Sequence, residues 1–227
     1  MTETSETPPM PRPAMLRFAA ASDPRAATSV SADGTPPGTD GPEDVWVFGY
    51  GSLMWRPGFD AIDRRPALLY GYHRDMCVRS IRYRGTPDKP GLVLGLRRGG
   101  SCRGIAYRVA GAAWTGVRAY LFEREMTTYA YQPRFGAVGL GDGHRVSGYT
   151  FVADPAHPQY AGDLDVSARI GLIRQGVGPN GTARDYLAST VDHLDELGIA
   201  DSHLHCLLAW VDGHVPPPEP ERNVPAP

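Results

Sequence analysis

The chain has 227 residues and a formal net charge of −2, which gives no electrostatic field that would attract nucleic acid or an anionic membrane surface. No stretch approaches the ~18 consecutive apolar residues of a membrane span. From the net charge we expect no nucleic-acid partner, and from the missing apolar stretch no membrane anchor. Cys77, Cys102 and Cys206 are an odd number of cysteines without close spacing. They argue against a disulfide scaffold and favour a reducing, cytoplasmic compartment.

Proline is concentrated at the two ends of the chain. Eight of the 22 prolines precede Val45 and six follow His214. Residues 1–44 also contain few large apolar side chains, so they cannot bury enough surface to offset the entropy lost on ordering. We therefore expect a disordered N-terminal tail at 1–44, one folded domain at 45–214 and a proline-rich C-terminal tail at 215–227.

The folded part begins with an apolar segment that ends in a glycine-bearing turn. Both faces of residues 45–48 are apolar, which predicts a strand that is buried on both sides. Gly49 and Gly51 then allow backbone angles in which successive peptide N–H groups, with the Ser52 hydroxyl, open toward a carboxylate or phosphate. An ordinary tight turn explains the segment equally well.

Two familiar glycine motifs do not fit this turn. The dinucleotide fingerprint needs a third glycine at position 54, where Met54 stands. The nucleophile elbow needs glycines on both sides of Ser52 at positions 50 and 54, which are Tyr50 and Met54. Ser52 is therefore a better candidate for a ligand donor than for a nucleophile.

Strand-type residues dominate the next part of the chain. Residues 67–80 predict a strand that is bent or interrupted at Gly71. Residues 92–96 and 102–109 flank the glycine-bearing stretch 97–101, an arrangement typical of a hairpin. A further strand is expected at 145–152.

Helical patterns follow the predicted strands. Apolar residues at helical spacing predict a helix from Trp114 to about Ala130, and shorter patterns predict helices at 164–173, from Thr182 to about Leu197, and from Asp201 onward. The order of elements predicts a mixed α+β domain, with a small curved or barrel-like β-sheet and helices against it.

Glu125 departs from the apolar pattern of its predicted helix. It shares a helix face with Val117 and Leu121, so its carboxyl is expected to be partly buried. Burial would raise its pKa toward about 6 to 7, which suits proton transfer at neutral pH. A structural ion pair with Arg124, Arg79 or another arginine is the alternative, and on the pattern alone it is the commoner explanation.

The run of His203, His205 and Cys206 does not predict a metal site. Residues two positions apart on a helix point about 200° away from one another, so the two histidines cannot share an ion without unwinding. Cys77 and Cys102 are interpreted as small buried strand residues. We expect no metal.

Several segments together resemble a known family. VFGYGSLMWRPGF, GYHR, RGTPDKPGLVLGL, GGSCRGIAYRV, REM followed by Tyr131 and Pro133, DPAHPQY and GPNGTARDYL are similar to the successive motifs of the ChaC-like γ-glutamylcyclotransferases. They occur in the family's order between Val45 and Leu197. The resemblance implies a small mixed β-barrel with flanking helices.

The resemblance also implies an activity and a set of site residues. The activity is cleavage of glutathione to 5-oxo-L-proline and L-cysteinylglycine without a metal or organic cofactor. Glu125 matches the family's catalytic glutamate. The residues implied to bind substrate are Tyr50, Gly51, Ser52 and Leu53 in the turn, with Tyr131 and Tyr186. The remaining alternatives are a cyclotransferase for other γ-glutamyl amides or dipeptides, and a non-catalytic binding module.

The reaction itself requires few protein groups. The α-amino group of the γ-glutamyl moiety attacks its own γ-carbonyl, so no enzyme nucleophile is needed. One buried carboxyl can take the ammonium proton and later protonate the departing nitrogen. Two positions depart from the family pattern, since Tyr129-Ala130 replaces a frequent glycine and Ala183 a frequent asparagine. We expect bulk at Tyr129 to narrow the pocket, and the change at 183 to loosen its turn or remove a substrate contact.

Overall fold

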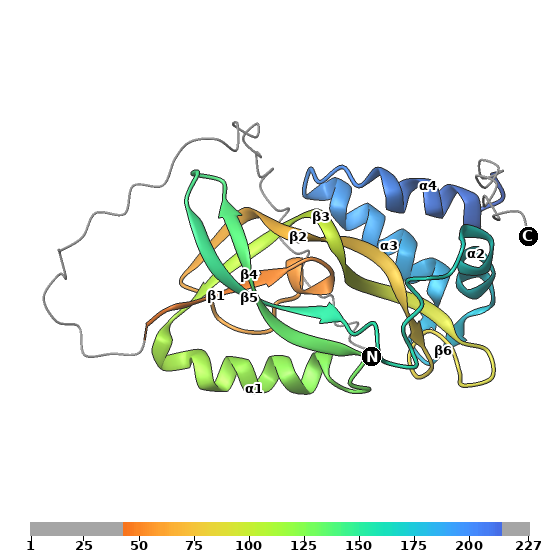
Figure 1. Ribbon diagram of the computed structural model, residues 1–227, viewed down its shortest axis with the longest axis horizontal. Helices are drawn as coiled ribbons and strands as arrows, with labels where there is room; N and C mark the ends of the chain where they lie inside the picture. Colours follow the sequence, from red (N-terminus) through yellow and green to blue (C-terminus); the bar gives the residue numbers. More distant parts are fainter. Residues whose placement is uncertain (1–42, 215–227) are drawn as a thin grey trace, which may run out of the picture.

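The computed structural model describes residues 43–214 (Figure 1). The tails expected at 1–44 and 215–227 lie outside the described residues, except for Glu43 and Asp44, which precede the first strand. No helix in the described part is long and apolar enough to cross a membrane.

Five strands form a closed barrel. They are β1 (Val45–Gly49), β2 (Asp63–Ser80), β3 (Gly91–Val109), β4 (Tyr131–Leu140) and β5 (Arg145–Ala153). Their order around the barrel is β1-β3-β2-β4-β5, and β1 closes it by pairing antiparallel with β3 and parallel with β5. The mixed barrel with flanking helices confirms the predicted fold class.

The hairpin predicted around residues 97–101 is wrong. β3 runs through this stretch without reversing and pairs with β2 on both sides of it, so β2 and β3 form one long hairpin closed by residues 81–90. Gly71, Gly99 and Gly100 have positive φ angles of 81°, 101° and 68°, and the pairing register shifts between Tyr70 and Tyr72. The glycines therefore bend two paired strands instead of turning the chain back.

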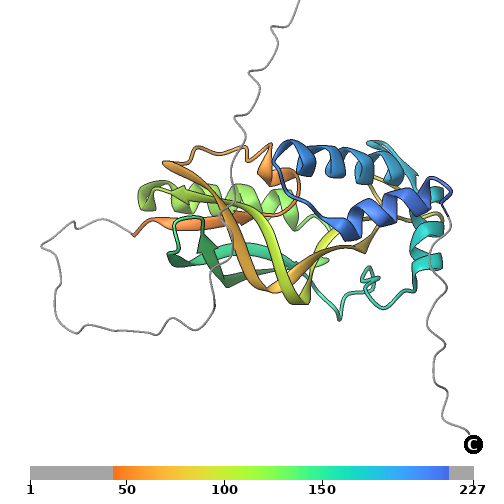
Figure 2. The ribbon, with the colours of Figure 1, turned by 90° about the horizontal axis from the view of Figure 1, so that it is seen from above.

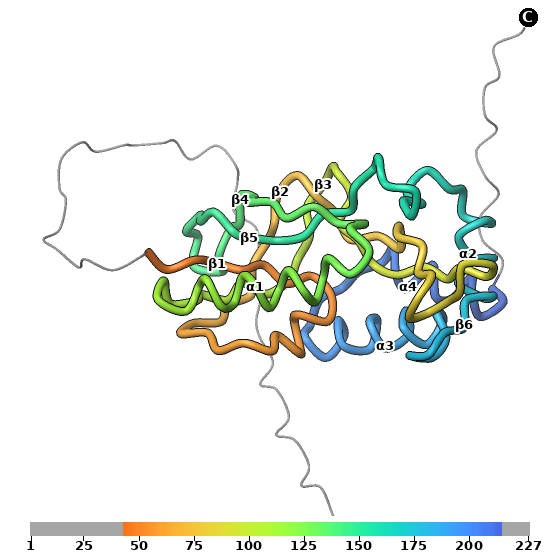
Figure 3. Tube along the Cα trace, turned by 90° about the horizontal axis from the view of Figure 1, so that it is seen from below, coloured from red at the N-terminus to blue at the C-terminus, as the bar shows by residue number. Residues whose placement is uncertain are grey.

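Helix α1 (Trp114–Glu125) ends five residues before the predicted boundary at Ala130. Tyr129 adopts φ 58°, a left-handed conformation that a continuing helix does not permit. The chain then enters β4, which the sequence pattern did not predict. Val117 and Leu121 of α1 are buried in the main core, while α1 itself lies along the outside of the barrel (Figures 1 and 3).

Three helices gather at the other end of the molecule (Figure 2). They are α2 (Val166–Gln175), α3 (Ala183–Glu196) and α4 (Ser202–Val211), and a two-stranded ribbon of β6 (Val177–Gly178) and β7 (Gly181–Thr182) lies between α2 and α3. Side chains of Asp165, Thr182 and Asp201 accept hydrogen bonds from peptide N–H groups in the first turns of these helices. The helix starts predicted at Thr182 and Asp201 are thus confirmed.

Candidate active site

The turn after β1 folds tightly against the strand that leads into it. A Cβ atom at Gly49 would lie 3.0 Å from the Leu53 Cβ, so only glycine fits there without a shift. Ser52–Met54 form one turn of 3₁₀ helix. Within residues 43–214, the peptide N–H groups of Gly51, Ser52 and Leu53 have no hydrogen-bond acceptor. The turn therefore presents three adjacent donors, as its sequence suggested.

Arg74 of β2 fixes the conformation of this turn. Its Nε donates a 2.6 Å hydrogen bond to the Tyr50 carbonyl oxygen, and its Nη2 donates one of 2.6 Å to the Arg103 carbonyl oxygen on β3. Its Nη1 pairs at 2.7 Å with Asp201, the N-cap residue of α4. The Arg74 side chain is buried and charged, so these three partners replace the water that it loses.

Arg124 joins the turn to the end of α1. Its Nη2 donates a 2.8 Å hydrogen bond to Ser52 Oγ, and its Nη1 donates one of 2.6 Å to the Arg56 carbonyl oxygen. Its Nε lies 3.3 Å from Glu125 Oε1. Because Ser52 Oγ accepts from Arg124, the hydroxyl hydrogen remains available for another acceptor.

Glu125 is largely enclosed at the C-terminal end of α1, with 21% of its side chain exposed. Burial raises its pKa above the ordinary 4.5, and the neighbouring Arg124 charge opposes that rise. The predicted rise in pKa is confirmed in direction. The alternative ion pair is present too, with Arg124 and not with Arg79, whose Nη1 donates to the Tyr160 carbonyl oxygen.

Three tyrosines from distant parts of the chain converge on Glu125. Burial raises the pKa of Tyr50, Tyr131 and Tyr186, to about 12 for Tyr186, and the Glu125 carboxylate adds to the rise in each. An electrostatic effect of Glu125 on all three hydroxyls requires them to lie near that carboxyl. Leu94 of β3 lies among them, since its carbonyl oxygen accepts a 2.6 Å hydrogen bond from the Tyr131 hydroxyl and its backbone also bonds the Tyr186 hydroxyl.

The structure thus brings together most of the residues that the sequence singled out. Leu53 differs from the others because its side chain is buried in the core, and its carbonyl oxygen accepts a hydrogen bond from Tyr107. Tyr129 is 63% exposed and contacts Phe122 edge to face, a placement that does not support a narrowed pocket. The role of Arg74 and the hydrogen bond from Arg124 to Ser52 were not predicted from the sequence pattern. For Arg74 the signal in the sequence was a charged residue within a predicted strand. For Arg124 it was the position next to the buried carboxyl of Glu125.

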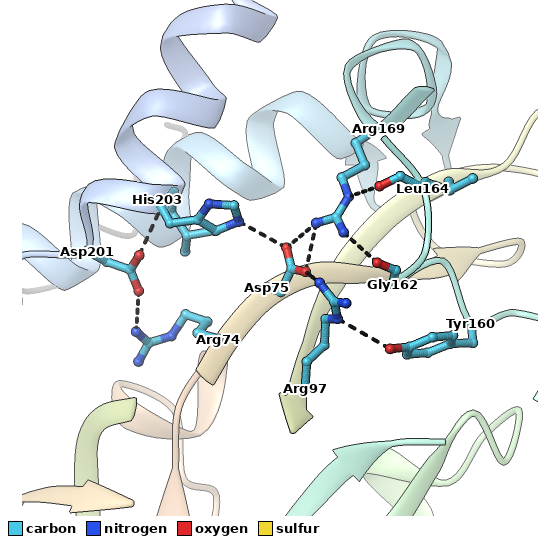
Figure 4. A network of polar contacts seen from close by, with 10 residues as sticks. Arg74, Asp75, Arg97, Tyr160, Gly162, Leu164, Arg169, Asp201 and His203 are labelled. Carbon is cyan, nitrogen blue, oxygen red and sulfur yellow. Dashed lines mark hydrogen bonds and ion pairs between the residues drawn. The ribbon is translucent and has the colours of Figure 1, made fainter. Parts of the chain in front are cut away.

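A second polar cluster is centred on Asp75, the residue of β2 that follows Arg74 (Figure 4). Asp75 is 1% exposed and receives two contacts of 2.6 and 2.7 Å from Arg169, one of 2.9 Å from Arg97 and one of 3.1 Å from His203. Burial alone would raise its pKa, but the hydrogen bond from His203, the charge of Arg169 and the hydrogen bonds from Arg169 and Arg97 hold the pKa well below 3.8. The cluster joins the barrel to α2 and α4.

A family model described as ChaC-like protein matches residues 45–214. The chain belongs to the ChaC-like family. It is 39% identical to the glutathione-specific gamma-glutamylcyclotransferase of Escherichia coli K12 over 167 residues, covering 74% of this chain and 72% of that one. It is 30% identical to the human glutathione-specific gamma-glutamylcyclotransferase 1, covering 87% of this chain and 92% of that one.

A solved structure supports the ChaC-like fold. The crystal structure of a yeast gamma-glutamyl cyclotransferase specific to glutathione superposes with a TM-score of 0.67 at 22% identity, covering 74% of this chain and 96% of that one. At this level of identity the match shows the shared fold. It agrees with the barrel and flanking helices described above.

On α4 of this ChaC-like chain, His203 and His205 each contact an acidic side chain. His203 Nε2 contacts Asp75, His205 Nε2 lies 3.0 Å from Asp195, and Cys206 is exposed. Within residues 43–214, no three histidine, cysteine or acidic side chains are grouped as metal ligands would be. Cys77 and Cys102 are buried strand residues, and burial raises the pKa of both thiols, to about 11 for Cys102.

Two surface cavities are not lined by Glu125. One of about 450 Å³ follows the outer face of α1 and is lined by residues that include Trp114 and Phe122. The other, of about 280 Å³, lies between the β2–β3 hairpin and the start of α4, where His73 and Asp201 line it. The convergence of Glu125, the turn and the three tyrosines, and not cavity size, identifies the candidate active site.

Proposed function

We propose that the protein is a γ-glutamylcyclotransferase that converts glutathione to 5-oxo-L-proline and L-cysteinylglycine. The observation that carries the proposal is a largely enclosed carboxyl, Glu125, next to a turn with three adjacent peptide donors. Family membership and the activity for which the relatives are named support the same reaction. The three unpaired cysteines fit a cytoplasmic location.

The turn supplies binding and orientation in this mechanism. The N–H groups of Gly51, Ser52 and Leu53 hold the α-carboxylate or the oxyanion that develops on the γ-carbonyl. Tyr50, Tyr131 and Tyr186 enclose the γ-glutamyl group, and their raised pKa values keep them as neutral hydrogen-bond donors and acceptors. Holding the amine beside the carbonyl replaces a search through many conformations of a flexible chain.

Glu125 moves the protons. As a carboxylate it takes a proton from the α-ammonium group, whose pKa is near ~8, and the free amine attacks the γ-carbonyl carbon. A carbon–nitrogen bond forms in the lactam, and the carbon–nitrogen bond to the cysteinyl residue breaks. The lactam keeps one ammonium proton, and two protons end on the departing nitrogen, with Glu125 carrying one at a time.

The test is production of 5-oxoproline by the purified chain from glutathione, from γ-glutamyl dipeptides and in buffer alone. Glu125→Gln should lower kcat about 100-fold to 10,000-fold, because the amide cannot accept the ammonium proton. Glu123→Gln is the matched control, since that side chain is exposed on the same helix. No product from any substrate would refute the proposal, and an active Glu125→Gln variant would place the base elsewhere.

The same assay separates the alternatives. Turnover of γ-glutamyl dipeptides with little turnover of glutathione would identify a cyclotransferase of different specificity. Binding without turnover would identify a binding module. The raised pKa of Glu125 favours the enzyme, because a partly buried carboxyl is costly to desolvate and gives a pure binder no benefit.

A further inference from the structure

Glutathione carries a second carboxylate, at its glycine end, for which the turn and Glu125 provide no cation. Two arginines adjoin the candidate site, but every nitrogen of their guanidinium groups already has a protein partner. Arg74 donates to the Tyr50 and Arg103 carbonyl oxygens and to Asp201. Arg124 contacts Ser52, Glu125 and main-chain carbonyl oxygens. Both hold protein groups in place.

The Arg84 guanidinium has N–H donors that no acceptor within residues 43–214 uses. Its guanidinium carbon lies 5.4 Å from the centre of the Tyr186 ring, and its charge acts on the Tyr186 hydroxyl. Within residues 43–214 its side chain makes one hydrogen bond, a long one of 3.3 Å from Nη1 to the Thr182 carbonyl oxygen. Its Nε and Nη2 therefore remain available to an incoming acceptor.

The backbone of Arg84 is held firmly in place. Its peptide N–H donates a 3.0 Å hydrogen bond to Ser80 Oγ. Its carbonyl oxygen packs so closely on Gly91 that a Cβ there would overlap it, and a Cβ at Gly176 would lie 2.6 Å from it. Two elements that are distant in sequence, the start of β3 and the end of α2, thus fix the origin of the side chain. A binding group fixed in this way loses little entropy when its ligand arrives.

We propose that Arg84 binds the C-terminal carboxylate of glutathione, and this inference rests on the proposed function. The Arg84 guanidinium lies over the Tyr186 ring, and Glu125 and Arg84 both act on the Tyr186 hydroxyl, so the cation and the proton-transfer group both adjoin this tyrosine. A substrate whose γ-glutamyl end is held by the turn beside Glu125 then extends past Tyr186 toward Arg84. A guanidinium group pairs with a carboxylate through two parallel hydrogen bonds. The substrate class is a γ-glutamyl peptide with a free carboxylate at its far end.

The test pairs a change in the enzyme with a change in the substrate. Arg84→Met is compared with the unmodified chain, using glutathione and its glycine ethyl ester, which lacks the second negative charge. The KM of the variant for glutathione should rise about 10-fold to 100-fold, the effect of one charge-assisted interaction. Its kcat should change little, because the contact is remote from the reacting atoms. The KM for the ester should be the same in both proteins, and Arg84→Lys should recover part of the loss.

Arg82→Met is the matched control. Arg82 is exposed two residues earlier and donates a long hydrogen bond of 3.5 Å to the Thr127 carbonyl oxygen. Its replacement removes the same charge from the same loop and should leave the preference for glutathione over the ester unchanged. Equal losses for both substrates in Arg84→Met, or the same loss of preference in Arg82→Met, would overturn the inference.

Calorimetry separates this inference from the proposed function. If the unmodified chain forms no 5-oxoproline, the proposed function fails, and binding then tests Arg84 on its own. Arg84→Met should still weaken the binding of glutathione about 10-fold to 100-fold and spare the ester. Equal affinity of the variant and the unmodified chain for glutathione would refute the role of Arg84 directly.

Discussion

Replacement of Asp75 by asparagine should destabilise the protein strongly, although the number of non-hydrogen atoms stays the same. The change keeps the shape of the side chain but removes the negative charge that faces Arg169, Arg97 and His203. The Arg169 residue is 7% exposed, so water cannot replace the lost carboxylate. Removing one partner of a buried ion pair costs about 3 to 5 kcal/mol. For a domain of this size that lowers the melting temperature by about 6 to 20 °C.

The effect should depend on pH in a defined direction. The pKa of Asp75 in the folded state is well below its ordinary 3.8. Its charge therefore stabilises the folded state above about pH 4, and this contribution is lost as the pH falls through the folded pKa. The difference in unfolding free energy between the unmodified chain and Asp75→Asn should be constant near neutral pH and should shrink below about pH 4.

Urea unfolding at several pH values measures both predictions. The control is His203→Gln, since that histidine contacts the same carboxylate but its side chain is 49% exposed. An exposed partner contributes about 0 to 1 kcal/mol. A loss below about 1 kcal/mol in Asp75→Asn would show that the buried cations find other partners and would refute the reasoning.

Two further predictions concern the candidate site and the segment that follows it. Arg124→Leu removes the cation 3.3 Å from Glu125, so the pKa of that carboxyl rises further. In the proposed mechanism Glu125 is ionised when it accepts the ammonium proton, so the fall of kcat/KM at acid pH should move upward by about one pH unit. Arg124→Lys should keep the original profile. Tyr129→Gly relieves a φ of 58° and should leave stability unchanged or raise it by about 1 kcal/mol. Its KM should equal that of the unmodified chain, and Tyr129→Ala, which keeps the strain, serves as the melting control.

The sequence predicted correctly those strands and helices whose determinants lie within a few neighbouring residues. The apolar strand β1 and the helices that begin after Thr182 and Asp201 were predicted because burial patterns and capping residues act over a few positions. The bend at Gly99 and Gly100 was mistaken for a turn, since positive φ angles occur in both structures. Only the pairing of β2 with β3, a tertiary property, distinguishes them.

β4 was missed because its glycines and Pro133 resemble breaks in a strand. The structure tolerates Pro133 because β2 pairs only with residues 138–140 of β4, so no ladder hydrogen bond on that side is needed at position 133. The site residues have the same dependence on tertiary structure. Tyr50, Tyr131 and Tyr186 were linked by the order of family motifs, while their convergence on Glu125 depends on how the barrel closes.

Two neighbouring residues of β2, Arg74 and Asp75, link the helices α2 and α4 to the candidate site. Arg74 holds the Tyr50 carbonyl oxygen on one side and the N-cap residue of α4, Asp201, on the other. Asp75 receives Arg169 from α2 and His203 from α4. Movement of α4 therefore displaces Asp201 and His203, the partners of Arg74 and Asp75. Because a small displacement of a positioned group slows a reaction strongly, substitutions at these helix contacts should affect kcat even where they leave the substrate-binding residues unchanged.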